Sequence, residues 1–170
     1  MLLSLSSLVE IGDYFFMSSV ETIVPPIRIN DPQSSFDRTP SAGEGHLFKF
    51  TQDGSLLDVL ILGEDTMYHT GGIDFDGQFI WASVAEYRPN SQPIVYKIDP
   101  ETMKPKVVFR SPNHLSSILE DFTSDPLYAV NRESRKFYQW GIDAGQQKNT
   151  PDSTDIHPNR HHYIDYQDCQ

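Results

Sequence analysis

The sequence predicts an all-β protein built from a repeated four-stranded unit, as in a β-propeller. Short apolar segments alternate with turn signals such as Gly12-Asp13, Asp76-Gly77 and Asp99-Pro100, and no stretch of any length has helical periodicity. The best-preserved unit runs from His69 to Phe109 and recurs in altered form on both sides. Because repetition of one such unit is the sequence signature of a propeller, we expect a partial β-propeller of about three four-stranded blades plus the first strand of a fourth.

The repeat is supported by two alignments of the chain with itself. His69-Thr-Gly-Gly-Ile matches His114-Leu-Ser-Ser-Ile at an offset of 45 residues, and Ser6-Ser-Leu matches Gly71-Gly-Ile at an offset of 65. The second offset exceeds an ordinary blade period by about 20 residues. This excess corresponds to a Pro- and Ser-rich insertion at residues 22–45. The insertion is interpreted either as an ordered loop that could act as a lid or as a disordered segment, and both interpretations remain open.

The blades are expected near Ser6–Leu62, Gly63–Phe109 and Arg110–Gln146, within a single domain spanning 1–170. Residues 146–160 are polar and contain two prolines, so they are expected to form a loop before a last strand that begins at His162. The expected strands are Ser7–Ile11, Tyr14–Val20, His46–Phe50, Ser55–Leu62, Gly71–Phe75, Gln78–Ala85, Ile94–Ile98, Lys106–Phe109, Leu115–Glu120, Leu127–Val130, Lys136–Trp140 and His162–Tyr166.

Composition excludes several classes of function. The formal net charge of −11 argues against nucleic acid as a partner, because phosphate binding needs a basic face. Cys169 is the single cysteine, so neither an intrachain disulfide nor a cysteine-based zinc site can form. No apolar run approaches the ~20 residues that cross a bilayer, so no membrane partner is expected. The opening Met1-Leu-Leu-Ser lacks a basic start, and the sequence favours a cytoplasmic over a secreted location.

Histidines and carboxylates recur at equivalent positions of the repeat. His69, His114 and His162 are expected just before the first strands of blades, and Glu21 and Glu86 just after second strands. Since the first two strands of a blade run antiparallel, these positions should meet at one mouth of the central channel. Glu133 is a weaker candidate for the same ring, because its alignment needs two extra residues in the preceding turn.

This ring predicts a site for metal binding or proton transfer, because imidazole and carboxylate serve as ligands and as bases. We expect His69, Glu86 and His114 as catalytic groups, and Glu21, His69, Glu86, His114 and His162 as ligands of a divalent metal ion. Residues that recur in every blade can also be structural ties between blades, and this second interpretation stays open. Arg88 could bind a carboxylate or phosphate of a substrate, or it could pair with Glu86.

Several of these motifs resemble a known family. They are His69-Thr-Gly-Gly-Ile-Asp, Ala85-Glu-Tyr-Arg-Pro, Val95-Tyr-Lys-Ile-Asp-Pro-Glu-Thr and the terminal His162-Tyr-Ile-Asp-Tyr-Gln-Asp-Cys. They resemble a family of bacterial and fungal proteins classified as a domain of unknown function with a propeller-like, six-bladed predicted fold. Members of that family are longer, so the resemblance implies that this chain is a truncated member. The family brings no established activity.

Two functions are expected from different classes. Propellers of similar shape include gluconolactonases and a metal-dependent lyase, so the first expectation is a lactonase-like hydrolase or lyase acting on a small molecule at the channel mouth. This is an analogy of fold alone. The second is a non-catalytic scaffold for other proteins. An incomplete ring would leave open strand edges and apolar faces, which favour self-association.

Overall fold

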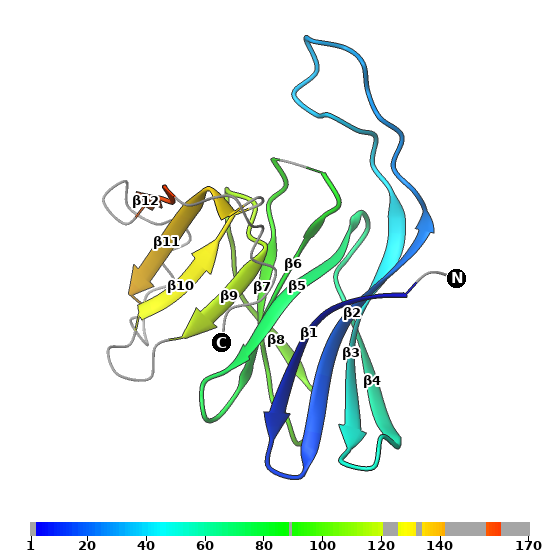
Figure 1. Ribbon diagram of the computed structural model, residues 1–170, viewed down its shortest axis with the longest axis vertical. Helices are drawn as coiled ribbons and strands as arrows, with labels where there is room; N and C mark the ends of the chain where they lie inside the picture. Colours follow the sequence, from blue (N-terminus) through cyan, green and yellow to red (C-terminus); the bar gives the residue numbers. More distant parts are fainter. Residues whose placement is uncertain (1–2, 89, 121–125, 132–133, 142–155, 161–170) are drawn as a thin grey trace.

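The computed structural model describes residues 3–88, 90–120, 126–131, 134–141 and 156–160 (Figure 1). Throughout these residues the regular secondary structure is β-strand, which confirms the all-β prediction. The strands are β1 (Leu3–Ile11), β2 (Tyr14–Val24), β3 (Ala42–Thr51), β4 (Leu56–Leu62), β5 (Met67–Phe75), β6 (Ile80–Glu86), β7 (Ile94–Ile98), β8 (Pro105–Arg110), β9 (Ser117–Glu120), β10 (Pro126–Val130), β11 (Lys136–Gly141) and β12 (Ile156–Pro158).

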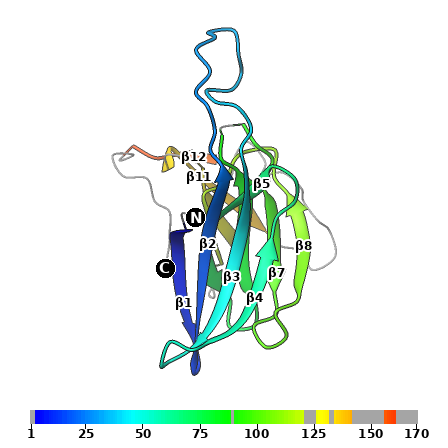
Figure 2. The ribbon, with the colours of Figure 1, turned by 90° about the vertical axis from the view of Figure 1, so that its right-hand side faces the viewer.

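The strands pair in three consecutive groups of four. β1–β4 form one antiparallel sheet in chain order, which we call the first sheet. β5–β8 and β9–β12 are also antiparallel in chain order, and a parallel bridge between Gly72 and Ser117 joins them into a second, eight-stranded sheet. The second sheet curls beside the first, as the two perpendicular views show (Figures 1 and 2).

Local turn chemistry explains why the hairpins form where the sequence predicts them. Gly12 and Gly77 adopt φ values of 58° and 84°, which cost little without a Cβ atom. The carboxylate of Asp76 accepts hydrogen bonds from the backbone N–H groups of Gln78 and Phe79, at 2.8 and 2.5 Å, and from the indole N–H of Trp81 at 2.8 Å. Asp99 accepts from the N–H groups two and three residues further on in the β7–β8 turn.

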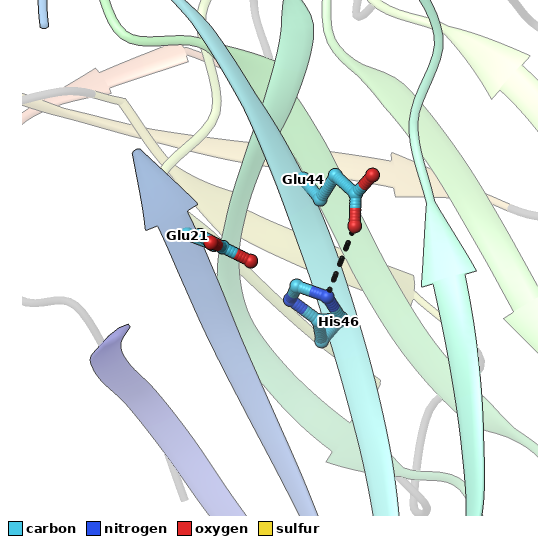
Figure 3. A group of neighbouring side chains, drawn as sticks. All are labelled: Glu21, Glu44 and His46. Atoms are coloured by element: carbon cyan, nitrogen blue, oxygen red, sulfur yellow. Dashed lines mark ion pairs between the residues drawn. The ribbon is translucent and has the colours of Figure 1, made fainter. Parts of the chain in front are cut away.

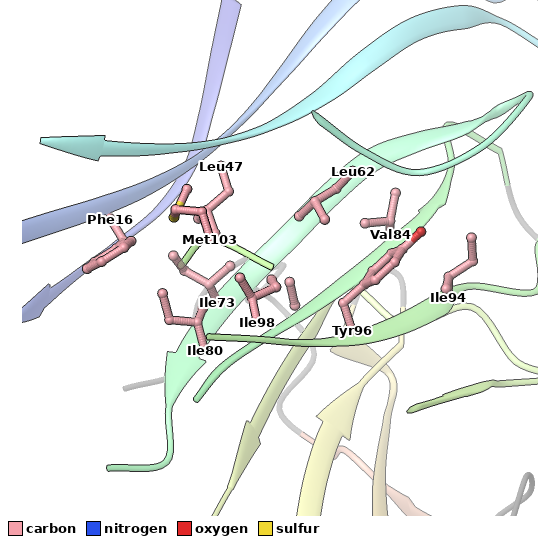
Figure 4. Close-up of a cluster of buried hydrophobic side chains, with 11 residues drawn as sticks. Phe16, Leu47, Leu62, Ile73, Ile80, Val84, Ile94, Tyr96, Ile98 and Met103 are labelled. Carbon is pink, nitrogen blue, oxygen red and sulfur yellow. The ribbon is translucent and has the colours of Figure 1, made fainter. Parts of the chain in front are cut away.

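The core lies between the first sheet and the β5–β8 group. Phe16, Leu47 and Leu62 of the first sheet pack against Ile73, Ile80, Val84, Ile94, Ile98 and their neighbours (Figure 4). A second cluster joins the β5–β8 group to the β9–β12 group around Trp81, Leu115, Tyr138 and Trp140. The middle group therefore contributes to both cores.

The groups also meet through polar contacts of β5. Ser18 Oγ donates to the carbonyl of Gly71 at 3.0 Å, and Thr70 Oγ1 donates to the carbonyl of Ser19 at 2.8 Å. On the other side, the N–H of Gly72 donates to the carbonyl of Ser116 at 3.1 Å. A Cβ atom on Gly71 would collide with that carbonyl, so glycine is required for this close approach.

The insertion between the first two hairpins is shorter than the sequence predicts. β2 continues to Val24 and β3 begins at Ala42, so strand pairing extends into the 22–45 segment from both ends. The β-branched Thr22, Ile23 and Val24 favour extended backbone, and Gly43 lets the ring of Tyr68 lie against β3. The remaining loop, residues 25–41, is itself folded back as a hairpin, with Ile29 N–H donating to the Asp37 carbonyl at 2.9 Å.

A second difference lies in the predicted polar loop at residues 146–160. Strand β12 forms inside it and pairs with β11 through Lys136–Pro158, Phe137–His157 and Tyr138–Ile156. An edge strand needs hydrogen bonds on one side only, so it accepts a proline and polar residues that would disfavour a central strand. The strand expected at His162–Tyr166 lies outside the described residues.

The outer face of the first sheet carries an apolar patch on β3 and β4. Leu47 and Lys49 of β3 point toward the second sheet, so His46 and Phe48, which alternate with them, lie on the opposite face. Their cross-strand partners on β4 are Ile61 and Val59, which are 59% and 41% exposed. The first sheet thus has apolar side chains on both faces, although the second sheet covers only one.

Candidate functional site

A compact polar cluster lies where β6 ends. Glu86, the last residue of β6, accepts hydrogen bonds from Arg88 Nε at 2.7 Å, from Arg88 Nη2 at 3.1 Å and from Thr66 Oγ1 at 2.5 Å. The side chains of Glu86 and Arg88 are only 14% and 17% exposed. Arg88 thus forms the ion pair with Glu86 that was one of its two expected roles. We call Thr66, Glu86, Arg88 and His114 the Glu86 cluster.

The surroundings of Glu86 lower its pKa. Burial by itself would raise the pKa of this carboxyl group, but the hydrogen bonds from Arg88 and Thr66 and the charges of Arg88 and His114 outweigh it. The carboxylate is therefore ionised at neutral pH, and its stabilised charge makes it a weak base. It is better suited to holding a cation or an imidazolium than to removing a proton.

His114 lies in the segment that leads into β9, and its charge contributes to the lowered pKa of Glu86. Its Nδ1 is 3.0 Å from Oγ of Ser91. Ser91 is 3% exposed, so its hydroxyl orients the imidazole and is too enclosed to attack a substrate. The sequence analysis missed Ser91 and Thr66, because neither carries a motif and both reach the cluster only through folding.

The 25–41 loop covers the cluster from the first sheet. The guanidinium carbon of Arg88 lies 3.9 Å from the centre of the Phe36 ring, and Asn90 Nδ2 donates to the Ser35 carbonyl at 2.8 Å. At the base of the loop, Tyr68 donates from its hydroxyl to Ser41 Oγ at 2.6 Å. These contacts hold the loop against β6 and the segment after it.

His69 occupies a different place from the expected one. It is the third residue of β5 and not a residue before the strand, because irregular pairing with β6 extends β5 back to Met67. Its ring meets the ring of Tyr87 edge-on, with centroids 4.8 Å apart. Residue 67 pairs with Glu86, so His69 and Glu86 lie at the same end of the sheet. His162 and Glu133 lie outside the described residues, and the ring of histidines stays a prediction.

Glu21 belongs to a second cluster, formed with Glu44 and His46 on the outer face of the first sheet (Figure 3). The ligand atoms of these three side chains lie within 4.8 Å of one another, and in the described part of the chain this is the one group of three that could hold a metal ion. Of the five predicted metal ligands, only Glu21 belongs to it. Glu44-Gly-His46 offered a signal that sequence analysis did not use, since residues two apart in a strand share a face.

A cavity of about 550 Å³ lies at the opposite end of the molecule. It is lined by the β1–β2, β5–β6 and β7–β8 turns and by Lys49, whose ammonium group donates to the Pro100 carbonyl at 2.8 Å. None of the predicted site residues lines it. Two of its four charged residues, Asp99 and Lys49, are engaged in holding turns. We place the candidate site at the Glu86 end, where several of the predicted site residues lie.

Comparison with known proteins identifies the family and the fold. A model of a family of unknown function, DUF6454, matches residues 4–170, so the chain belongs to that family. This confirms the resemblance found in the sequence. A search of curated proteins finds no match. In the described part of the chain, no helix has the length and apolar character needed to cross a membrane.

Two solved structures are similar in fold. They are candidate 6-phosphogluconolactonases from Bacteroides uniformis and Bacteroides fragilis, with 15% and 12% sequence identity and a TM-score of 0.51 in both cases. Each comparison covers 92% of this chain and 55% of the other. The chain thus spans about half the length of the structures it matches, and at this identity the likeness concerns the fold alone.

Proposed function

We propose that the three groups of strands are consecutive blades of a β-propeller and that the chain carries a hydrolase or lyase site at the Glu86 end. The order β1-β2-β3-β4, repeated for β5–β8 and β9–β12, is that of propeller blades. The contacts of β5 with both neighbouring groups support a central position for the first strand of each blade. The apolar patch on the outer face of the first sheet suits a blade that has a neighbour on each side.

The substrate class that fits this end is a small anionic lactone or ester. The observation that carries the proposal is the Glu86 cluster, where an ionised carboxylate, an arginine and an oriented imidazole meet at a strand end. Glu86 neutralises much of the charge of Arg88, but within the described residues Nη1 of Arg88 has no hydrogen-bond partner and can donate to a substrate oxygen. The fold similarity to candidate 6-phosphogluconolactonases supports the same class of substrate.

In the proposed reaction His114 is the general base. Ser91 fixes the ring through Nδ1, and the nearby carboxylate of Glu86 favours the imidazolium that forms when His114 takes a proton from the attacking water. The hydroxide so formed attacks the carbonyl carbon, and the bond from that carbon to the leaving oxygen breaks. His114 returns its proton to the leaving oxygen, and the product carboxylic acid releases its own proton to solvent. His69, beside Tyr87, supplies a second imidazole at the same end of β5.

This proposal is tested by measuring the hydrolysis of glucono-δ-lactone and of its 6-phosphate in a pH-stat, which records the protons released. His114→Gln should lower kcat by about 10²-fold or more, the usual contribution of a general base. His157→Gln, on the exposed strand β12, is the matched control and should leave the rate unchanged. Absence of hydrolysis above the uncatalysed rate with both lactones would exclude this substrate class, and equal rates for both variants would exclude His114 as the base.

A non-catalytic interaction scaffold is the alternative, and the outer face of the first sheet supports it. Leu57, Val59 and Ile61 form an exposed apolar row along β4, which is an edge strand. Such rows favour association with another chain. Light scattering of the purified protein tests this: we expect a self-associated species that Ile61→Lys converts to monomer, whereas Glu10→Lys on β1 does not. A monomer at all concentrations would contradict it.

A further inference from the structure

We propose that Glu21, Glu44 and His46 form a binding site for a divalent transition-metal ion of the Zn²⁺ type. This site is separate from the Glu86 cluster, and the inference does not depend on the proposed hydrolase. It lies on the outer face of β2 and β3, at the base of the 25–41 loop (Figure 3).

The first observation is a pair of like charges. Glu21 and Glu44 are directly opposite each other in the β2–β3 ladder, and directly opposed like charges destabilise a sheet. Neither carboxylate has an arginine or lysine partner in the described part of the chain, where the ion pairs of arginine and lysine involve other acidic residues. A bound cation would convert this repulsion into attraction.

The second observation is the imidazole of His46. This residue is 8% exposed, and its Nδ1 is buried with no hydrogen-bond partner among the described residues. An unpartnered polar atom in such a place is costly. Figure 3 shows the edge of the ring that carries both nitrogens turned toward the two carboxylates. The ring stacks on Phe48, with centroids 5.3 Å apart and planes 14° from parallel, which fixes this orientation.

The spacing of the donor atoms matches a metal site. Nε2 of His46 is 3.5 Å from Oε2 of Glu44, and two ligands of one tetrahedral Zn²⁺ are roughly 3.3 Å apart when each is about 2.0 Å from the ion. The third donor, from Glu21, lies within 4.8 Å of both, so a small rotation of its side chain would complete the set.

The donor set decides which ion fits. One imidazole nitrogen and two carboxylate oxygens suit Zn²⁺ and similar first-row ions, whereas Mg²⁺ and Ca²⁺ prefer oxygen ligands alone. Three protein ligands leave one tetrahedral position for water or a ligand. The Glu44 side chain is 45% exposed, so the ion can enter from solvent.

Calorimetric titration of the purified 170-residue protein with Zn²⁺, and with Mg²⁺ in parallel, tests the inference. We expect one equivalent of Zn²⁺ to bind, and the melting temperature to rise by about 5 °C or more at a hundredfold excess of free Zn²⁺ over Kd. Mg²⁺ should cause no comparable rise. Glu44→Gln should weaken the Kd for Zn²⁺ by more than about tenfold, since even outer partners of metal ligands contribute that much.

Glu44→Gln keeps the size of a half-exposed side chain, so this variant should fold, and His46→Gln provides the second ligand test. Glu10→Gln, an exposed glutamate of β1 in the same sheet, is the matched control and should bind Zn²⁺ like the parent protein. Absence of Zn²⁺ binding overturns the inference. So does binding that is unchanged in Glu44→Gln and His46→Gln, because the ion would then be held by other residues.

Discussion

The Glu86 cluster and the Glu21–Glu44–His46 cluster differ in whether their carboxylates have a positively charged partner. Glu86 accepts three hydrogen bonds from Arg88 and Thr66, has a cation 2.7 Å away and has a lowered pKa. Glu21 and Glu44 face each other across a strand pair, beside an imidazole that uses only one of its nitrogens. Both clusters lie next to the 25–41 loop. The difference in the partners of their carboxylates therefore arises from the neighbouring side chains and not from a different location in the fold.

The difference shows which cluster needs something from outside the chain. The charges of Glu86 and Arg88 compensate each other, so this pair can stabilise the fold without a ligand. In the proposed reaction it acts on a substrate only through His114 and the remaining N–H donor of Arg88. The Glu21–Glu44–His46 cluster has two opposed carboxylates with no arginine or lysine partner among the described residues, so a cation would complement its charge. Variants that remove one charge at a time should separate these two behaviours.

The largest effect is expected from Arg88→Met. This change leaves the mostly buried carboxylate of Glu86 without its cation, and we expect the free energy of unfolding to fall by about 2 kcal/mol, between the values for exposed and fully buried pairs. Urea denaturation at pH 7 measures it. Adding Glu86→Gln should restore part of the loss, because no buried charge then remains unpaired. A double variant that is less stable than Arg88→Met would contradict the ion-pair explanation.

The pH dependence of stability sharpens the same comparison. The pKa of Glu86 in the folded protein lies below its ordinary value of 4.5, so its stabilising contribution is complete above that value and is lost as the pH falls through the pKa of the folded state. The stability difference between the parent protein and Arg88→Met should therefore be constant near neutrality and shrink below about pH 4.5. Denaturation curves between pH 7 and pH 3 measure it, and a difference that grows on acidification would be the contrary result.

The smallest effect is expected from Glu21→Gln in metal-free buffer at pH 8. Removing one of two directly opposed like charges should raise the free energy of unfolding by about 0.5 kcal/mol, whereas Glu10→Gln should have no effect of this sign. The melting temperature in the presence of a chelator measures it. A lower melting temperature in Glu21→Gln than in the parent protein would contradict repulsion between the two carboxylates.

Much of the fold could be predicted because its signals are local. Gly12-Asp13 and Asp76-Gly77 specify tight turns through their own backbone and side-chain chemistry, so the hairpins lie where the sequence indicates. The ends of β2 and β3 could not be predicted in the same way. Strand pairing between residues 21 and 44 depends on contacts across a long insertion and on the fit of Gly43 against Tyr68, which no local pattern encodes.

The candidate sites show the same limit. The pairing of Arg88 with Glu86 was foreseeable as one of two roles, because the residues are two positions apart at a strand end. Glu44 and His46 were missed because the repeat analysis compared blades with one another, whereas these residues meet Glu21 within a single hairpin. The alternation of Glu44 and His46 along one strand carries the information, but only once the register with β2 is known.

The β5–β8 group lies between the two cores, and this position affects which strands unfold locally. It packs on the first sheet through one core and on the β9–β12 group through another. Among the described residues, the β9–β12 group is joined to it by one strand bridge, at Gly72–Ser117, and by the side chains around Trp81. Local unfolding follows such differences in attachment. Amide protons of β6 and β7 should therefore exchange with solvent only in global unfolding, while those of β10 and β11 exchange through a partial opening that leaves the first eight strands folded.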